Sequence, residues 1–296
     1  MARNPLAGFA IVAPAARFDP RHMRIALVSD THLSPNDALL EQNWRAVAAW
    51  IEALRPDLLV HLGDISANGA HDPAELAHAR AVIAAPACDV LFLPGNHDIG
   101  DAGAPDEPLE SRSLAAYRRA FGPDRWSLQT AGWQLLGLNA QLLGDPGEEA
   151  QAQWAWLAES LAGSEAPLGV MSHKPLRPYG PEPPGRYPDP AARQRLLDML
   201  RARDLRFVVS GHTHQSLGFR AAGARHVWAP SVAFVIPDAI QAPVGAKRVG
   251  AMLLELSPAR FTLRSAAPAG LARRDLFELE HIYPQVRDMR RGAEAP

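Results

Sequence analysis

Residues 23–54 read MRIALVSDTHLSPNDALLEQNWRAVAAWIEAL, a short apolar run followed by a longer segment with a different period. The opening run, MRIALV, predicts a buried strand. From Leu40 to Ile51 the large apolar residues recur at spacings of three and four, which is typical of an amphipathic helix. The stretch therefore predicts one strand followed by one helix.

The same strand–helix unit repeats along the chain. The further apolar runs are LLVHLGD (58–64), DVLFLPGNHD (89–98), WQLLGLNA (133–140), LGVMSH (168–173) and FVVSGHTH (207–214). This alternation predicts an α/β domain with a largely parallel sheet. Near the C-terminus, RHVWAP, AMLLELS and FTLRSA follow without long helices between them and are expected to be adjoining antiparallel strands, so the sheet region is expected to be mixed.

Composition restricts the classes of partner. At 296 residues and 47% hydrophobic, the chain can bury a sizeable core. Its 30 Lys and Arg nearly balance 32 Asp and Glu, so no global field would draw it onto a nucleic acid polymer or an anionic membrane. No stretch reaches the roughly 20 apolar residues of a membrane span. A small anionic substrate would therefore need a local site.

The ends of the chain differ from its middle. Residues 1–22 form an N-terminal extension that imitates a short signal peptide, but Gly8 and Pro14 interrupt its apolar run, so a cytoplasmic protein is expected and secretion is the alternative. The repeating units occupy a domain at 23–264. The charged tail at 265–296 is expected to pack on this domain or on a partner subunit, and a homo-oligomer stays open.

Each apolar run ends in polar residues of the same few kinds. These residues are Asp30, His32, Asp64, Asn96, His97, Asp98, His173, His212 and His214. In an open α/β sheet the ligand site lies outside the carboxyl ends of the strands, so these groups are expected to converge. A spacing of two in an extended segment would put Asp30 and His32 on one side, and likewise His212 and His214.

The residue types point to metal ions. Carboxylates, an amide and imidazoles, with no thiolate, suit Mn, Fe, Zn, Co or Mg rather than a soft metal. Without His97 and Asp98, two carboxylates, one amide and four imidazoles remain. These seven groups are too many for one tetrahedral ion, but they suffice for two ions if one carboxylate bridges. Two divalent ions about 3.5–4 Å apart are a known arrangement for phosphoryl transfer.

In this order, SDTH, GD, GNHD, SH and GHTH resemble the signature of the calcineurin-like metallophosphoesterases, from about Met23 to Arg264. The resemblance implies an αββα sandwich of two mixed β-sheets flanked by helices. It also implies two metal ions that share Asp64. One would be held by Asp30, His32, Asp64 and His214, and the other by Asp64, Asn96, His173 and His212.

The same resemblance gives roles to the two remaining polar residues. His97 would be an acid or transition-state stabiliser rather than a ligand, assisting attack by a metal-bridging hydroxide, and Asp98 would orient it. The GD loop with Gly69, GNHD and GHTHQ most resemble the class III cyclic-nucleotide phosphodiesterases. A phosphodiesterase for small phosphoesters is therefore expected, with cyclic nucleotides as one candidate. A phosphomonoesterase or nuclease on the same centre, and a non-catalytic scaffold, are the alternatives.

A proline-rich loop, KPLRPYGPEPPGRYPDP at 174–190, follows His173 directly. It is either a stiff connector or an edge of the site. In the second case Arg177 or Arg186 would grip a phosphate and Tyr187 would stack on a base.

Overall fold

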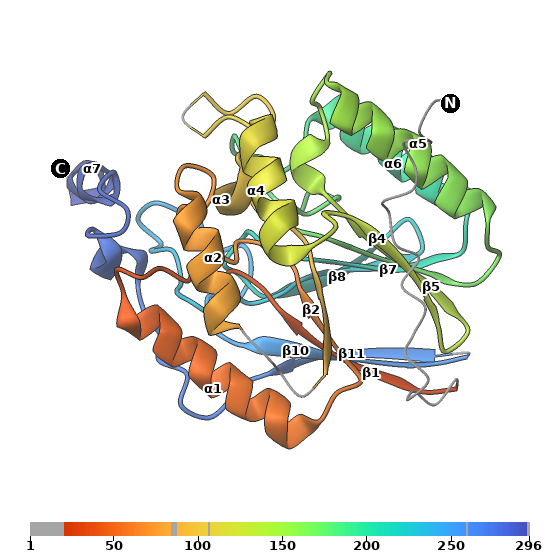
Figure 1. Ribbon diagram of the computed structural model, residues 1–296, viewed down its shortest axis with the longest axis horizontal. Coiled ribbons are helices and arrows are strands. Elements are labelled where there is room, and N and C mark those ends of the chain that lie inside the picture. The colour runs from red at the N-terminus through yellow and green to blue at the C-terminus, as the bar shows by residue number, and fades with distance from the viewer. Residues whose placement is uncertain (1–20, 84–87, 106, 259, 295–296) are drawn as a thin grey trace.

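The computed structural model describes residues 21–83, 88–105, 107–258 and 260–294. The predicted extension at 1–22 lies almost wholly outside the described residues. Two mixed β-sheets lie face to face with helices on both outer sides, and Figure 1 shows α1 on one side of the sheets and α5 and α6 on the other. This confirms the expected αββα sandwich.

The first sheet has five strands in the order β11-β10-β1-β2-β3. Its strands are β1 (Met23–Val28), β2 (Leu58–His61), β3 (Asp89–Phe92), β10 (Ala251–Ser257) and β11 (Arg260–Ala266). β1, β2 and β3 are parallel, whereas β10 runs antiparallel to both β1 and β11. The carboxyl ends of β1 to β3 therefore lie at one edge.

The second sheet has six strands in the order β4-β5-β6-β7-β9-β8. Its strands are β4 (Trp126–Thr130), β5 (Trp133–Leu138), β6 (Leu168–Ser172), β7 (Leu205–Ser210), β8 (Leu217–Ala221) and β9 (Ala224–Trp228). β5, β6, β7 and β9 are parallel, and β4 and β8 close the two edges as antiparallel hairpin strands.

The placement of RHVWAP beside the last two strands was wrong. This segment forms β9, which pairs with β7 and β8 in the second sheet, whereas β10 and β11 pair with each other as expected. The sequence reading also missed β8, which makes β9 the second arm of a hairpin. β8 is an edge strand whose residues are only partly buried, so its apolar signal is weak.

The main core lies between the sheets. Ile25 and Val60 from the first sheet pack with Trp133 and Phe207 from the second, and all four are buried. Within the second sheet, Gly137 on β5 makes room for the ring of its β4 partner Trp126, because a Cβ there would lie 2.2 Å from that ring. The tight interface fixes one sheet against the other, and with it the loops that leave both sheets.

Helices cover the two outer faces. The helices are α1 (Ala38–Leu54), α2 (Pro73–Val82), α3 (Asn96–Ile99), α4 (Ser111–Phe121), α5 (Glu148–Ala162) and α6 (Pro190–Arg201), with a 3-10 turn η1 (Ala140–Leu142). α1, α2 and α4 pack on the first sheet, and α5 and α6 pack on the second. α1 begins where the Asp37 carboxylate accepts the N–H groups of Leu39 and Leu40.

The C-terminal segment packs on its own chain. It contains the 3-10 turn η2 (Leu276–Leu279) and α7 (Val286–Glu294), with Pro284 between them preventing one continuous helix. Leu279 and Val286 pack against Leu40 and Phe234 of the domain. Among the described residues, no helix combines the length and apolar character needed to cross a membrane.

Candidate metal centre

The polar groups at the strand ends converge as the sequence predicts. Asp30, His32 and His214 each offer a ligand atom, and these three atoms lie within 4.8 Å of one another. Asp64, His173 and His212 form a second group of the same size. Five loops, those after β1, β2, β3, β6 and β7, bring these groups and Asn96 to one place.

The backbone at these ligands is not extended, which corrects the reason given for their convergence. Five of them adopt the left-handed region: Asp30 (φ 55°), His32 (φ 45°), Asp64 (φ 51°), His212 (φ 68°) and His214 (φ 52°). This conformation is uncommon outside glycine and costs about 1–3 kcal/mol for each residue. The side chains therefore turn inward because the loops are strained, not because a strand continues.

Glycines let the loops approach one another. A Cβ on Gly95 would lie 2.0 Å from Asp64 Oδ1, and one on Gly211 would lie 1.8 Å from the Ser29 hydroxyl. Gly63 has φ +106°, and a Cβ there would meet His173 Nδ1 at 2.6 Å. Each glycine precedes a candidate ligand residue, so the glycines of the motifs GD, GN and GH are required for close packing of the loops.

Backbone carbonyls fix the orientation of three imidazoles. Nδ1 of His173 lies 3.0 Å from the Leu62 oxygen, and Nδ1 of His214 lies 2.9 Å from the Phe234 oxygen. Because a carbonyl only accepts, both Nδ1 atoms carry hydrogen, and both Nε2 atoms face the centre. For His212 the roles are reversed, since Nε2 donates to the Gly185 oxygen at 3.0 Å.

Asp64 lies between the two groups. Its Oδ2 is 3.2 Å from His173 Nε2 and 3.7 Å from His32 Nε2, while its Oδ1 accepts the His97 backbone N–H at 3.0 Å. Burial favours protonated Asp64, but the positive charges of His173 and His97 hold the pKa of its carboxyl well below its usual range. A carboxylate in this position can face two ions at once.

The histidines of the centre differ in their preference for a proton, because burial lowers the pKa of His32 and His212 well below its usual range whereas His173 is shifted upward. Burial alone would lower the pKa of His173, but the carboxylates of Asp64, Asp30 and Asp98 raise it to about 9. His173 Nε2 also lies 3.1 Å from His212 Nδ1, and His32 Nε2 lies 3.2 Å from His214 Nε2. Ring nitrogens this close share a proton or a metal cation, so the donor set fits bound metal.

Asn96 presents a free oxygen to the same place. Its Nδ2 donates to Glu107 Oε2 at 3.0 Å, whereas its buried Oδ1 has no hydrogen-bond partner among the described residues. A buried acceptor without a donor is costly, and a metal ion would satisfy it. Glu107 was missed by the sequence reading because it lies outside every strand-end motif.

His97 is held by partners other than the expected one. Its Nδ1 lies 3.1 Å from the Ala67 oxygen and 3.5 Å from Glu107 Oε1. The Asp98 carboxylate instead accepts the N–H groups of Ile65, Ser66 and Gly95, and it forms no hydrogen bond with the His97 ring. The expected orienting role of Asp98 therefore has no direct hydrogen bond to the ring behind it. Asp98 ties the GD loop to the GNHD turn.

The proline-rich loop borders the centre, and its three candidate residues lie in different surroundings. Arg186 lines a cavity of about 450 Å³ together with Asn96 and His212. Arg177 lies near His226, where burial and the Arg177 charge lower the pKa of this histidine to about 4. The Tyr187 hydroxyl accepts the Tyr179 N–H at 3.3 Å, so this tyrosine braces the loop.

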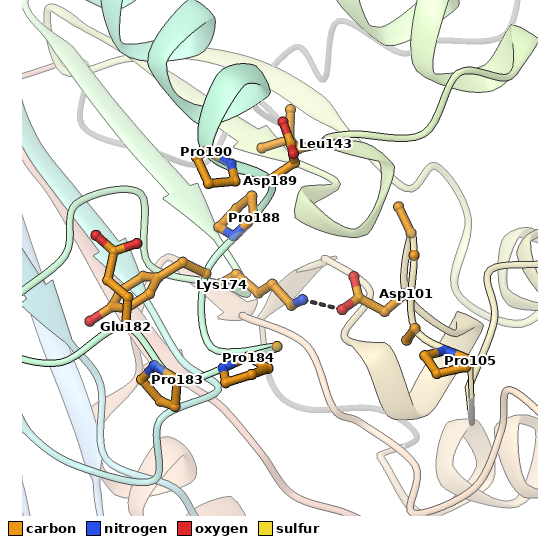
Figure 2. Close-up of a pocket in the computed structure, with 15 residues that line it drawn as sticks. Asp101, Pro105, Leu143, Lys174, Glu182, Pro183, Pro184, Pro188, Asp189 and Pro190 are labelled. Atoms are coloured by element: carbon orange, nitrogen blue, oxygen red, sulfur yellow. Dashed lines mark hydrogen bonds and ion pairs between the residues drawn. The ribbon is translucent and has the colours of Figure 1, made fainter.

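A second cavity, also lined by this loop, adjoins the first. It measures about 530 Å³, and Figure 2 shows Lys174 pointing at Asp101 across it, with Pro183, Pro184 and Pro188 around them. The ion pair is nearly buried. The Gly185 oxygen in this loop also accepts a hydrogen bond from His212, so the loop contacts the candidate metal centre.

An apolar cavity of about 210 Å³ opens directly over the ligand cluster. Its polar side is made by Asp64, His97 and ligand imidazoles, and its apolar side includes Phe234, Ile236 and Met289. An ester could therefore place its phosphoryl group on the cluster and its organic group on the apolar side.

Known proteins resemble this chain along most of its length. The sequence profile of the calcineurin-like phosphoesterase family matches residues 23–216. A Psychrobacter arcticus protein named a probable cyclic nucleotide phosphodiesterase is 28% identical over 63% of this chain and 68% of its own length. The glycerophosphodiester phosphodiesterase GpdQ of Enterobacter lignolyticus is 30% identical over 65% of this chain and 71% of its own length.

Solved structures share the fold at low sequence identity. A dimetal phosphatase from Danio rerio superposes with a TM-score of 0.61 at 15% identity, covering 83% of this chain and 96% of that one. A purple acid phosphatase from yellow lupin gives 0.63 at 12% identity, covering 86% of this chain and 53% of that one. With the family profile matched over most of the described domain, the chain belongs to the calcineurin-like phosphoesterases and is a metal-dependent phosphoesterase.

Proposed function

We propose that this protein is a binuclear metal-dependent phosphodiesterase acting on small phosphodiesters, with cyclic nucleotides as one candidate substrate group. The observation that carries the proposal is the position of Asp64 between two groups of inward-facing ligand atoms. One group, Asp30, His32 and His214, would hold one ion. The other, His173 and His212 with Asn96, would hold the second.

Two bound divalent ions would activate water as a nucleophile and neutralise charge on the phosphoryl group. The chain's residues arrange that chemistry. Backbone carbonyls fix His173, His212 and His214, and both Asp30 oxygens accept the His212 N–H at 3.1 and 3.2 Å. The ligand set is therefore rigid before substrate arrives, which lowers the cost of reaching the productive geometry.

His97 would supply the proton for the leaving group. It lines the cavity beside the ligands, and burial is outweighed by the charges of Glu107, Asp64 and Asp98, which raise the pKa of its ring. A positioned imidazole that carries a proton can act as a general acid or stabilise a phosphoryl oxygen. Asp98 would act only at a distance, by holding the turn that carries His97.

The choice of a diester rests on the cavity and on the relatives. The apolar wall of Phe234, Ile236 and Met289 suits an ester with a sizeable organic group. The proteins named above include a probable cyclic nucleotide phosphodiesterase and a glycerophosphodiester phosphodiesterase. Manganese, iron and zinc are all compatible with these oxygen and nitrogen ligands.

A substrate panel tests the proposal. Protein stripped with chelator is expected to lose activity and to regain it with added Mn²⁺, and to hydrolyse bis-nitrophenyl phosphate or a cyclic nucleotide faster than nitrophenyl phosphate. Faster hydrolysis of the monoester would favour a phosphomonoesterase. Protein that binds metal yet hydrolyses none of the three would favour a scaffold.

Arg186 is expected to bind the substrate phosphate. Its side chain is 8% exposed and lines the cavity beside Asn96 and His212, and its guanidinium has no hydrogen bond or ion pair with another described residue. A hydrogen bond to a charged group contributes about 1.5–3 kcal/mol, so Arg186→Ala should raise KM for a diester by about tenfold or more. kcat should change much less.

Arg177→Ala provides the matched control from the same loop. Arg177 is not among the residues that line the cavities beside the ligand cluster, so its loss should leave KM unchanged. Equal KM values for wild type and Arg186→Ala would show that Arg186 does not bind substrate and that the loop has a structural role only. Melting temperatures of both variants show whether either change disturbs the fold.

A further inference from the structure

We propose that Tyr283, in the C-terminal segment 274–294, is a positioning residue for the ligand His32, and that this segment thereby sets the affinity of one of the two metal ions. The inference rests on the proposed binuclear centre. Tyr283 lies beyond the part of the chain that the family profile matches, residues 23–216.

The contact is short and enclosed. The Tyr283 hydroxyl lies 2.7 Å from His32 Nδ1, and the tyrosine is 6% exposed. The two rings meet edge to face with centroids 6.0 Å apart, and the Phe234 ring lies 4.9 Å from that of His32 on another side. His32 therefore has little freedom to turn, and among the described residues the one hydrogen-bond partner of its Nδ1 is the Tyr283 hydroxyl of the C-terminal segment.

His32 differs in this respect from the other ligand histidines. His173, His212 and His214 each fix their outer nitrogen on a backbone carbonyl. When a cation binds His32 through Nε2, the ring proton must lie on Nδ1 and donate to the Tyr283 oxygen. The hydroxyl can accept this proton and so hold the ring with Nε2 toward the centre, whereas backbone carbonyls hold the other three rings.

The segment is docked by contacts that do not involve this hydroxyl. The Val235 N–H donates to the Arg274 oxygen at 2.9 Å, and the Leu276 N–H donates to the Val235 oxygen at 3.0 Å. His281 Nε2 lies 3.0 Å from the Asp37 carboxylate. Removing the hydroxyl alone should therefore leave the segment in place and isolate its effect on His32.

Tyr283→Phe tests the proposal by calorimetric titration of Mn²⁺ into metal-free full-length protein. Removing the partner of a ligating histidine commonly weakens metal binding by about 10–100-fold, so one of two binding steps should weaken by that factor while the other is unchanged. The metal-free variant should melt within about 2–4 °C of wild type, because only one hydrogen bond is lost.

Tyr117→Phe is the matched control, since Tyr117 is buried and its hydroxyl has no hydrogen-bond partner among the described residues. It should bind both ions as wild type does. If Tyr283→Phe also binds both ions with wild-type affinity, Tyr283 only packs and the inference is wrong. If the wild-type protein binds fewer than two ions, the proposed binuclear centre is itself wrong. The wild-type titration shows this without any variant.

Discussion

Asp64→Asn is expected to abolish stable metal binding and to reduce diester hydrolysis by about a thousandfold or more. Both ion sites would lose their shared carboxylate, and the several kcal/mol that bound metal contributes to the transition state correspond to at least that factor. The asparagine Oδ1 can still accept the His97 N–H, and its Nδ2 would face the His173 lone pair. The fold should therefore survive while the cation site does not. Elemental analysis after dialysis and thermal melting with and without Mn²⁺ measure both effects.

Asp72→Asn provides a control that changes the same functional group on an exposed position. Asp72 caps α2 through the Ala74 N–H, and asparagine caps helices equally well. This variant should bind metal, melt and turn over as wild type does. The decisive comparison is the rise in melting temperature on adding Mn²⁺, because a ligand that binds only folded protein stabilises it. If Mn²⁺ raises the melting temperature of Asp64→Asn as much as that of wild type, Asp64 is not a shared ligand.

The ligand cluster could be predicted because strand ends are visible in the sequence. Apolar runs such as those ending at Val28 and His61 mark buried strands, and parallel strands share one carboxyl edge. Asp30 and Asp64 were therefore expected together without any distance information. What the sequence could not give was the left-handed backbone of both residues, because that conformation depends on neighbouring loops packing through Gly95 and Gly211.

The division of the strands between two sheets was harder to predict from the sequence. Strand pairing is set by contacts between distant segments, and β9 could pair with either neighbour on apolar pattern alone. The hairpin with β8 and the parallel contact with β7 placed it in the second sheet. The order of motifs fixed the family fold, but periodicity by itself predicted only a mixed sheet region.

The supporting residues of the site were missed for a related reason. Glu107 follows no strand, and Tyr283 lies 251 residues from His32 in the chain. Neither belongs to a local pattern that suggests metal chemistry, although the tail that contains Tyr283 was expected to pack on the domain or on a partner subunit. Residues that act through a ligand need only reach it in space, so their sequence positions are free to vary.

His97→Ala is expected to keep metal content near that of wild type and to lower kcat by about 10²–10⁴-fold, the usual contribution of a general acid. Alanine retains the backbone N–H that Asp64 accepts, so the metal cluster keeps its geometry. If His97 protonates the leaving group, the loss should be largest for an alkyl ester and smallest for a nitrophenyl ester, whose leaving group needs little protonation. Turnover of both esters, with elemental analysis of each preparation, measures this.

His71→Ala is the control, because His71 is exposed and its backbone N–H donates to the Asn68 oxygen in the same loop region. It should change neither metal content nor turnover. An equal loss for both esters in His97→Ala would assign His97 to the phosphoryl oxygens rather than to the leaving group, since only proton donation depends on the leaving alkoxide. Unchanged turnover of both esters would remove His97 from the reaction altogether and leave the chemistry to the metal cluster and Arg186.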